Sequence, residues 1–109
     1  MTAVTRADQI VADVAAQLPR QFPFITEIRL FGSYAHGSHT ARSDMDFLIL
    51  TKEPLKNRIL RSEVREAIDS IAQKQRMETD VVFYTFDLYQ NDQSRFSREL
   101  RKNILVFKR

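Results

Sequence analysis

Cysteine is absent from this sequence of 109 residues, which excludes disulfide bonds and thiolate metal sites. No apolar run approaches the ~20 residues that a membrane-spanning helix requires, and the N-terminus does not follow the pattern of a signal peptide. Together these absences favour a reducing compartment, and we expect a cytoplasmic protein. Glycine is scarce as well, and both glycines, Gly32 and Gly37, fall in one short segment.

The rest of the composition is that of one globular domain over residues 1–109, with 43% hydrophobic and 28% charged residues. The formal net charge is +3, and a basic cluster lies near the C-terminal end: Arg95, Arg98, Arg101, Lys102, Lys108 and Arg109. A solvated basic face explains this cluster, and contact with a polyanion, a nucleotide phosphate or an acidic partner is the functional alternative. Because the cluster does not alternate with aromatic residues as a single-strand platform would, direct nucleic-acid binding is not expected.

Apolar periodicity predicts an α+β fold of two layers, in which helices pack on a small mixed sheet. Helices are expected at 7–18 (ended by Pro19), 33–37, 55–75 and 92–102, with a left-handed Asn103 stopping the last one. Strands are expected at 26–31, 45–51, 78–85 and 104–107. The strand at 45–51 is apolar on both faces beyond its first residues, so it is expected at the centre of the sheet.

Two acids, Asp44 and Asp46, lead into this central strand. Residues two apart on a strand point to the same side, so both carboxylates should converge on one patch. Like charges at the start of an apolar strand are costly unless a cation lies between them, and oxygen ligands suit Mg²⁺. A pair of acids that caps a turn is the simpler explanation, and it would be preferred if the pair stood alone.

Gly32 and Ser33 end the preceding strand and begin a short helix. The backbone N–H groups and the dipole of that helix would form a phosphate cradle, with the Ser33 hydroxyl as an additional donor. Glycine permits the close approach of a ligand to the backbone. Ser33 as a simple N-cap is the alternative. In combination with the acids of the neighbouring strand, the cradle and the cations would meet on one triphosphate.

A third acid, Asp80, precedes the apolar run 81–84, where a carboxylate has no structural purpose. If its strand pairs with that of Asp44 and Asp46, three carboxylates share one site. Two Mg²⁺ ions held there could stabilise the attacking and leaving oxygens, and Asp80 could help to take the proton of an incoming hydroxyl. Glu78 has the same strand parity and is the second choice for this role.

Other polar residues near the acids have weaker claims. Arg42 and Ser43 could contact the nucleotide, and His36 and His39 could contact phosphate or ribose, although surface positions explain the histidines equally well. The tyrosines are expected to be packing residues rather than catalysts: Tyr34, Tyr84 and Tyr89.

The composite motif, Gly32-Ser33 followed after ten residues by Asp44-Met45-Asp46 and then by Asp80, resembles the signature of the DNA polymerase β-like nucleotidyltransferase superfamily. The longer stretches 31–37 and 43–49 are similar to its minimal nucleotidyltransferase (MNT) branch. The resemblance covers nearly the whole chain. It implies a palm-type domain that transfers a nucleoside monophosphate from a nucleoside triphosphate to a hydroxyl.

By this resemblance, Gly32 and Ser33 would hold the triphosphate, Asp44 and Asp46 would bind two Mg²⁺, and Asp80 would be the third ligand and the base. Many MNT proteins are antitoxins that transfer AMP from ATP to a tyrosine of a HEPN toxin. The chain lacks the Arg-x4-His signature of HEPN proteins, so it would be the MNT partner. Larger relatives carry a helical domain after the palm, and a partner chain is expected to complete the pocket here.

Two other functions remain open on sequence alone. The chain could be a non-catalytic antitoxin that neutralises a toxin by binding. It could also be a small-molecule nucleotidyltransferase of the antibiotic-modifying kind, which is less favoured because no acceptor-binding segment follows the palm motifs.

Overall fold

The computed structural model describes residues 5–37, 44–91 and 103–109, which form a four-stranded mixed sheet with helices on both sides. The strand order is β3-β2-β1-β4, with these bounds: β1 Ile25–Phe31, β2 Met45–Thr51, β3 Thr79–Thr85 and β4 Ile104–Lys108. Strand β2 runs parallel to β3 and antiparallel to β1, and β4 runs antiparallel to β1. The expected α+β fold is confirmed, and β2 is an interior strand as expected.

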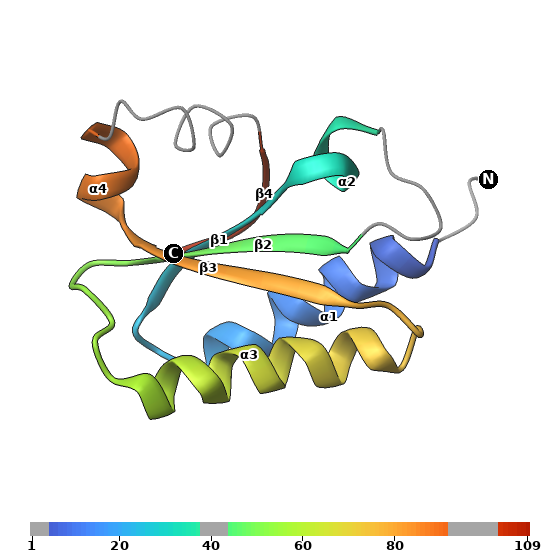
Figure 1. Cartoon of the computed structure of the whole chain (residues 1–109), viewed down its shortest axis with the longest axis horizontal. Coiled ribbons are helices and arrows are strands. Elements are labelled where there is room, and N and C mark those ends of the chain that lie inside the picture. The colour runs from blue at the N-terminus through green and yellow to red at the C-terminus, as the bar shows by residue number, and fades with distance from the viewer. Residues whose placement is uncertain (1–4, 38–43, 92–102) are drawn as a thin grey trace.

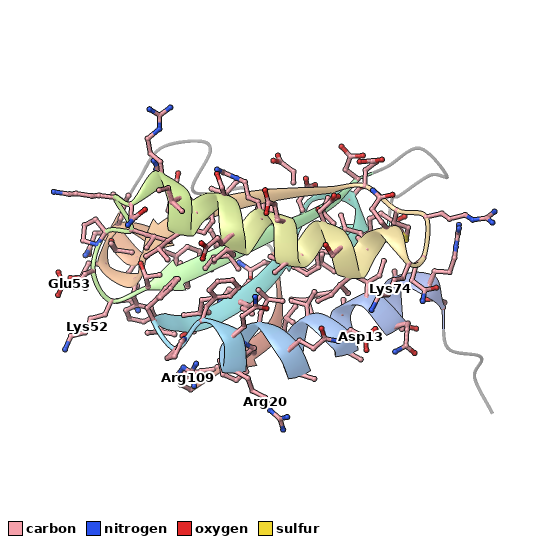
Figure 2. The ribbon with its side chains drawn as sticks, turned by 90° about the horizontal axis from the view of Figure 1, so that it is seen from below. Asp13, Arg20, Lys52, Glu53, Lys74 and Arg109 are labelled. Atoms are coloured by element: carbon pink, nitrogen blue, oxygen red, sulfur yellow. The ribbon has the colours of Figure 1, made fainter. Side chains whose placement is uncertain are left out.

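The two faces of the sheet differ in what covers them. The long helices, α1 (Arg6–Gln21) and α3 (Arg58–Gln73), pack on one face, while the short helices, α2 (Gly32–His36) and α4 (Phe86–Asn91), lie on the opposite side (Figure 1). Figure 2 views the covered face, with α1 and α3 in front of the strands. We call the other face the open face.

The main core lies between the sheet and the two long helices. Met45, Phe47 and Ile49 of β2 are fully buried against apolar residues of α1 and α3, such as Val14 and Ile68. Leu48 and Leu50 alternate with them and form a smaller apolar cluster on the open face. This alternation explains why the sequence of β2 is apolar on both faces. It also fixes the register of the strand, because a slip of one residue would exchange the two faces.

Helix boundaries differ from the expected ones at two places. Helix α1 does not end at Pro19 but continues to Gln21, with Pro19 buried in its last turn. Proline removes one N–H near the helix end, and the Phe22 N–H still closes the turn on the Leu18 carbonyl at 2.9 Å. Helix α3 begins at Arg58 because the Asn57 side chain caps it, accepting from two backbone N–H groups.

The region before β4 also differs from expectation. Helix α4 was not expected; it begins after Thr85, whose hydroxyl accepts the Leu88 N–H at 3.1 Å. The helix expected at 92–102 lies outside the described residues. Asn103 is not left-handed, because Arg76 is the one non-glycine residue with positive φ in the described part of the chain. The Asn103 side chain instead hydrogen-bonds to Arg29 and Tyr89.

Two further expectations can be compared with the structure. Arg109, counted in the basic cluster, has a structural role, since its guanidinium donates to the Ile25 and Pro19 carbonyls at 2.7 Å each. Among the described helices, none is long and apolar enough to span a membrane.

We expect Asn57→Ala to destabilise the protein by about 1 kcal/mol, because the Ile59 and Leu60 N–H groups lose their acceptor. Urea denaturation followed by circular dichroism measures the loss. Lys52→Ala, an exposed substitution in the same connection, is the control and should change the free energy of unfolding by less than about 0.5 kcal/mol. Equal effects of the two substitutions would contradict the capping role.

Candidate active site

The candidate site is a row of residues across the open face at one end of the sheet. In the register of the strands, Phe31 of β1 lies opposite Asp46 of β2, and Asp46 lies opposite Asp80 of β3. Directly opposed residues on neighbouring strands point to the same face and are about 4.8 Å apart at Cα. Asp46 and Asp80 therefore project from the face that α1 and α3 leave uncovered. The strand pairing expected from the sequence is confirmed.

Asp46 is the electrostatic centre of this row. Partial burial raises the pKa of its carboxyl group above the ordinary value, and the negative charges of Asp80 and Asp44 raise that pKa further. Asp44 is exposed and immediately precedes β2. Asp80 and Asp44 therefore both lie within electrostatic range of Asp46. Such a group of like charges is relieved by a proton or by a cation.

The contact with Asp46 requires a glycine at position 32. A Cβ atom at position 32 would overlap Oδ2 of Asp46 and lie 3.1 Å from its Cγ. The φ angle of Gly32 is +73°, a value that other residues adopt only at a cost. The start of α2 therefore sits directly against the Asp46 carboxylate, which brings the expected phosphate cradle and the expected metal ligand into contact.

Ser33 is the second residue of α2 and is partly buried. It is not the N-cap, since Phe31 occupies that position and has no side chain that can accept a hydrogen bond. The N–H groups in the first turn of α2 thus receive no capping oxygen from the N-cap side chain. Gly37 ends the helix in the left-handed conformation.

Asp80 lies at the start of β3, an edge strand, and is exposed. Its Oδ1 accepts the Val81 N–H at 3.0 Å. Within residues 5–37, 44–91 and 103–109, no three acidic or histidine side chains are gathered closely enough to enclose a metal ion. The three carboxylates share a face without forming a closed ligand set.

This arrangement still suits Mg²⁺. Magnesium is usually held by one or two carboxylates, several waters and the phosphates of a substrate, rather than by a cage of protein atoms. Asp46 and Asp80 in register, with Asp44 two residues away, supply oxygen donors of the required kind. Burial and, after it, the charges of Asp80 and Asp44 raise the pKa of Asp46, and a divalent cation beside the carboxylate would offset both effects.

The alternative third acid, Glu78, lies elsewhere. Its carboxylate is 3.4 Å from Nε2 of Gln73 on α3, and its backbone carbonyl accepts the Met45 N–H. It is therefore engaged with the helix layer. Arg42, Ser43 and His39 lie outside the described residues. Tyr84 and Tyr89 pack on the Leu48–Leu50 cluster, as the sequence predicted.

One polar network on the open face was not anticipated. Glu27 is 96% buried, and it forms an ion pair with Arg29 at 3.0 Å. Arg29 also donates to Asn103, whose amide donates to the Tyr89 hydroxyl at 2.8 Å. In the sequence, the only sign of this ion pair is an acid and a base two residues apart on one strand. Pairing with β4 makes that strand an interior strand of the sheet.

We expect Gly32→Ala to destabilise the protein by about 2–4 kcal/mol, because it combines an unfavourable φ with overlap on the Asp46 carboxylate. Gly37→Ala is the matched control. It has nearly the same φ, +72°, but its Cβ would meet nothing within 4 Å, so it should cost about 1 kcal/mol. Chemical denaturation compares the two variants. Equal losses would show that the contact with Asp46 imposes no constraint.

We expect Asp46→Asn to raise the melting temperature at pH 7 without divalent cations. The pKa of Asp46 is raised in the folded state, so the folded protein binds this proton more tightly than the unfolded chain does. The stability of the wild type therefore falls as pH rises from the ordinary pKa through the raised pKa of the folded state. Below pH 3.8, the ordinary value, the difference between variant and wild type should vanish. Adding Mg²⁺ should stabilise the wild type more than the variant. Asp13→Asn, a change at a partly exposed position of α1, should show none of these effects.

Solved structures with similar folds include three at low sequence identity. A toxin–antitoxin crystallised with AMP-PNP has 22% identity and a TM-score of 0.61, over 86% of this chain and 70% of that one. A candidate nucleotidyltransferase from Sulfolobus solfataricus has 18% identity and a TM-score of 0.60, over 95% and 84%. A mutant of the toxin–antitoxin MntA–HpeT has 19% identity and a TM-score of 0.59, over 86% and 70%. These similarities establish the fold.

Comparison with curated proteins finds no significant match. The sequence model of one family, described as the nucleotidyltransferase domain, matches residues 11–106. That span includes Gly32, Ser33 and all three acids of the candidate site. It covers most of the chain, from the first turns of α1 into β4. The chain therefore belongs to the nucleotidyltransferase domain family.

Proposed function

We propose that this protein is a Mg²⁺-dependent nucleotidyltransferase that moves AMP from ATP to a hydroxyl group, a tyrosine, of a partner HEPN toxin, and that it acts as the antitoxin. The observation that carries the proposal is the position of Asp46, with the Gly32 backbone against its carboxylate and Asp80 in register beside it. This geometry occurs in a chain of the nucleotidyltransferase domain family.

In the proposed reaction, the acceptor oxygen attacks the α-phosphorus of ATP. The bond from that phosphorus to the bridging oxygen breaks, and pyrophosphate leaves. Gly32 and Ser33 bind phosphate oxygens through the first turn of α2, and Ser33 can add its hydroxyl. Arg42 and Ser43 are proposed to contact the nucleotide. Asp80, which is exposed at the sheet edge, is proposed to accept the proton of the acceptor hydroxyl.

Asp44, Asp46 and Asp80 are the proposed ligands of two Mg²⁺ ions. When bound, Mg²⁺ neutralises charge on the phosphates and on the attacking and leaving oxygens. Without the cation, the negative charges of Asp46 and of the neighbouring Asp80 and Asp44 would repel a triphosphate. The carboxylates and the cation are thus interdependent, and the protein residues orient the reactants rather than supply covalent chemistry.

Support for the substrate and the partner comes from the structural neighbours. One of them is a toxin–antitoxin crystallised with AMP-PNP, and another is a mutant of the MntA–HpeT toxin–antitoxin. An ATP analogue and a toxin partner are therefore compatible with this fold. The transfer of AMP to a tyrosine is inferred from the family resemblance of the motif.

To test the proposal, the purified chain is incubated with Mg²⁺, ATP labelled at the α-phosphate, and the HEPN protein encoded beside it. Labelling of the HEPN protein is expected. Asp46→Ala should lower the labelling rate roughly a hundredfold or more, since a metal ligand is lost. Asp13→Ala, on the helix-covered side of the sheet, should label at the wild-type rate (Figure 2). Equal labelling by wild type and Asp46→Ala would refute the proposal.

A second candidate function is neutralisation of a toxin by binding alone. It is favoured by one observation, the hydrogen bond of Asp80 to the backbone of its own strand, which leaves the three carboxylates without a closed ligand set. The two functions separate in a growth-rescue assay. Under the catalytic proposal Asp80→Ala fails to rescue cells from the toxin, and under the binding alternative it rescues them as fully as wild type.

A further inference from the structure

A cavity lies at the end of β2 and β3 that is opposite the end carrying the carboxylates. Its volume is about 390 Å³, and its lining includes Thr51 and Thr85, the last residues of the two strands. Asp46 and Thr51 are five residues apart on β2, which corresponds to about 16 Å. The cavity is therefore separate from the candidate active site, and its size is within the range of small-molecule sites.

Arg61 of α3 lines this cavity and is partly buried. Among the described residues, its Nε is the one buried side-chain nitrogen or oxygen atom without a hydrogen-bond partner. A buried N–H without an acceptor costs stability, and the cost is larger when the group is charged. Because protein atoms cover this Nε, an oxoanion in the cavity would offset the positive charge through the part of the guanidinium that lines the cavity, by a charge-assisted hydrogen bond.

The surroundings of Arg61 add positive charge. Lys56 also lines the cavity. In the part of the chain that the structure describes, the one ion pair is that of Arg29 with Glu27, so neither Lys56 nor Arg61 is neutralised by a carboxylate. Lys52 and Glu53 lie in the same connection between β2 and α3, at the periphery of the molecule (Figure 2), and neither lines the cavity.

The remaining walls are largely apolar. Leu55, Phe83 and Leu88 line the cavity, and the Leu88 side chain is 50% exposed. An exposed leucine beside a cavity provides a surface that an apolar group can cover. The cavity thus combines two unneutralised cations with apolar walls, which is the chemistry that recognises an anion attached to an apolar body.

We propose that this cavity is a binding site for an organic anion with a carboxylate or phosphate group and an apolar body. The anion accepts hydrogen bonds from the guanidinium of Arg61 and from Lys56, and the apolar body packs on Leu55, Phe83 and Leu88. The site lies outside the proposed nucleotidyl transfer and does not depend on it. The anion can be a free small molecule or an acidic side chain within an apolar peptide segment.

Phenylbutyrate is a suitable probe, and phenylbutylamine, with a similar apolar body and a cationic head, is its control. Titration followed by amide chemical shifts should give a Kd on the order of 1 mM for phenylbutyrate. The shifts should concentrate at residues 51–56 and 83–88. The amine should bind at least about tenfold more weakly. Absence of saturable shifts with phenylbutyrate, or equal affinity for the amine, would overturn the proposal.

Variants test the role of Arg61. Arg61→Gln should weaken phenylbutyrate binding about tenfold, whereas Arg58→Gln, an exposed change one turn earlier on α3, should leave it unchanged. If Arg61→Gln does not fold, Leu88→Glu places a negative charge at the exposed wall and should also abolish binding. Wild-type affinity in whichever of these lining variants folds would overturn the proposal.

A peptide arm distinguishes the source of the anion. The blocked tripeptide Phe-Glu-Leu is titrated beside phenylbutyrate, with Phe-Gln-Leu as its control. Tighter binding of the acidic peptide identifies a segment of a partner protein, and tighter binding of phenylbutyrate identifies a free small molecule. Either result supports the proposed site. If neither the peptide nor phenylbutyrate binds, the proposal is overturned.

Discussion

The contact between the Gly32 backbone and the Asp46 carboxylate is the constraint on which the candidate site depends. It requires a residue without Cβ at the start of α2, and it places the first turn of that helix against the central carboxylate. The β1–β2 register puts Asp46 opposite Phe31, one residue before Gly32, so the pairing of two strands determines this contact. The site is thus built into the sheet rather than added by a loop.

The two faces of the sheet have different roles, and this difference makes the charged site possible. The covered face buries the large apolar residues of β2 against α1 and α3, which provides the main core. The open face is left to carry charge at the start of β2 and β3 and a small apolar cluster further along. The cost of placing three like charges near one another is offset by the packing on the opposite side of the same strands.

Much of this architecture could be predicted because it depends on local patterns. The alternation of β2, the glycine before Ser33 and the spacing of the acids are all visible in the sequence, and they led to the correct fold class and strand pairing. Pro19 was misread because proline ends helices by a local rule, whereas its position in the last turn makes it tolerable. Asn103 was misread, and the burial of Glu27 was not anticipated, because their environments depend on β4, which is distant in sequence from β1. The orphaned Nε of Arg61 is likewise a product of tertiary packing.

The hydrogen bond between Asn103 and Tyr89 joins the residue that precedes β4 to α4. Arg29, in the central part of the sheet, also donates to Asn103, so positions 89 and 103 are held close together. When the ends of a segment are fixed in this way, its length affects stability only weakly, because the entropy of closure grows slowly with residue number. A change in the number of residues between these two anchored positions should therefore cost the sheet and its row of acids little stability.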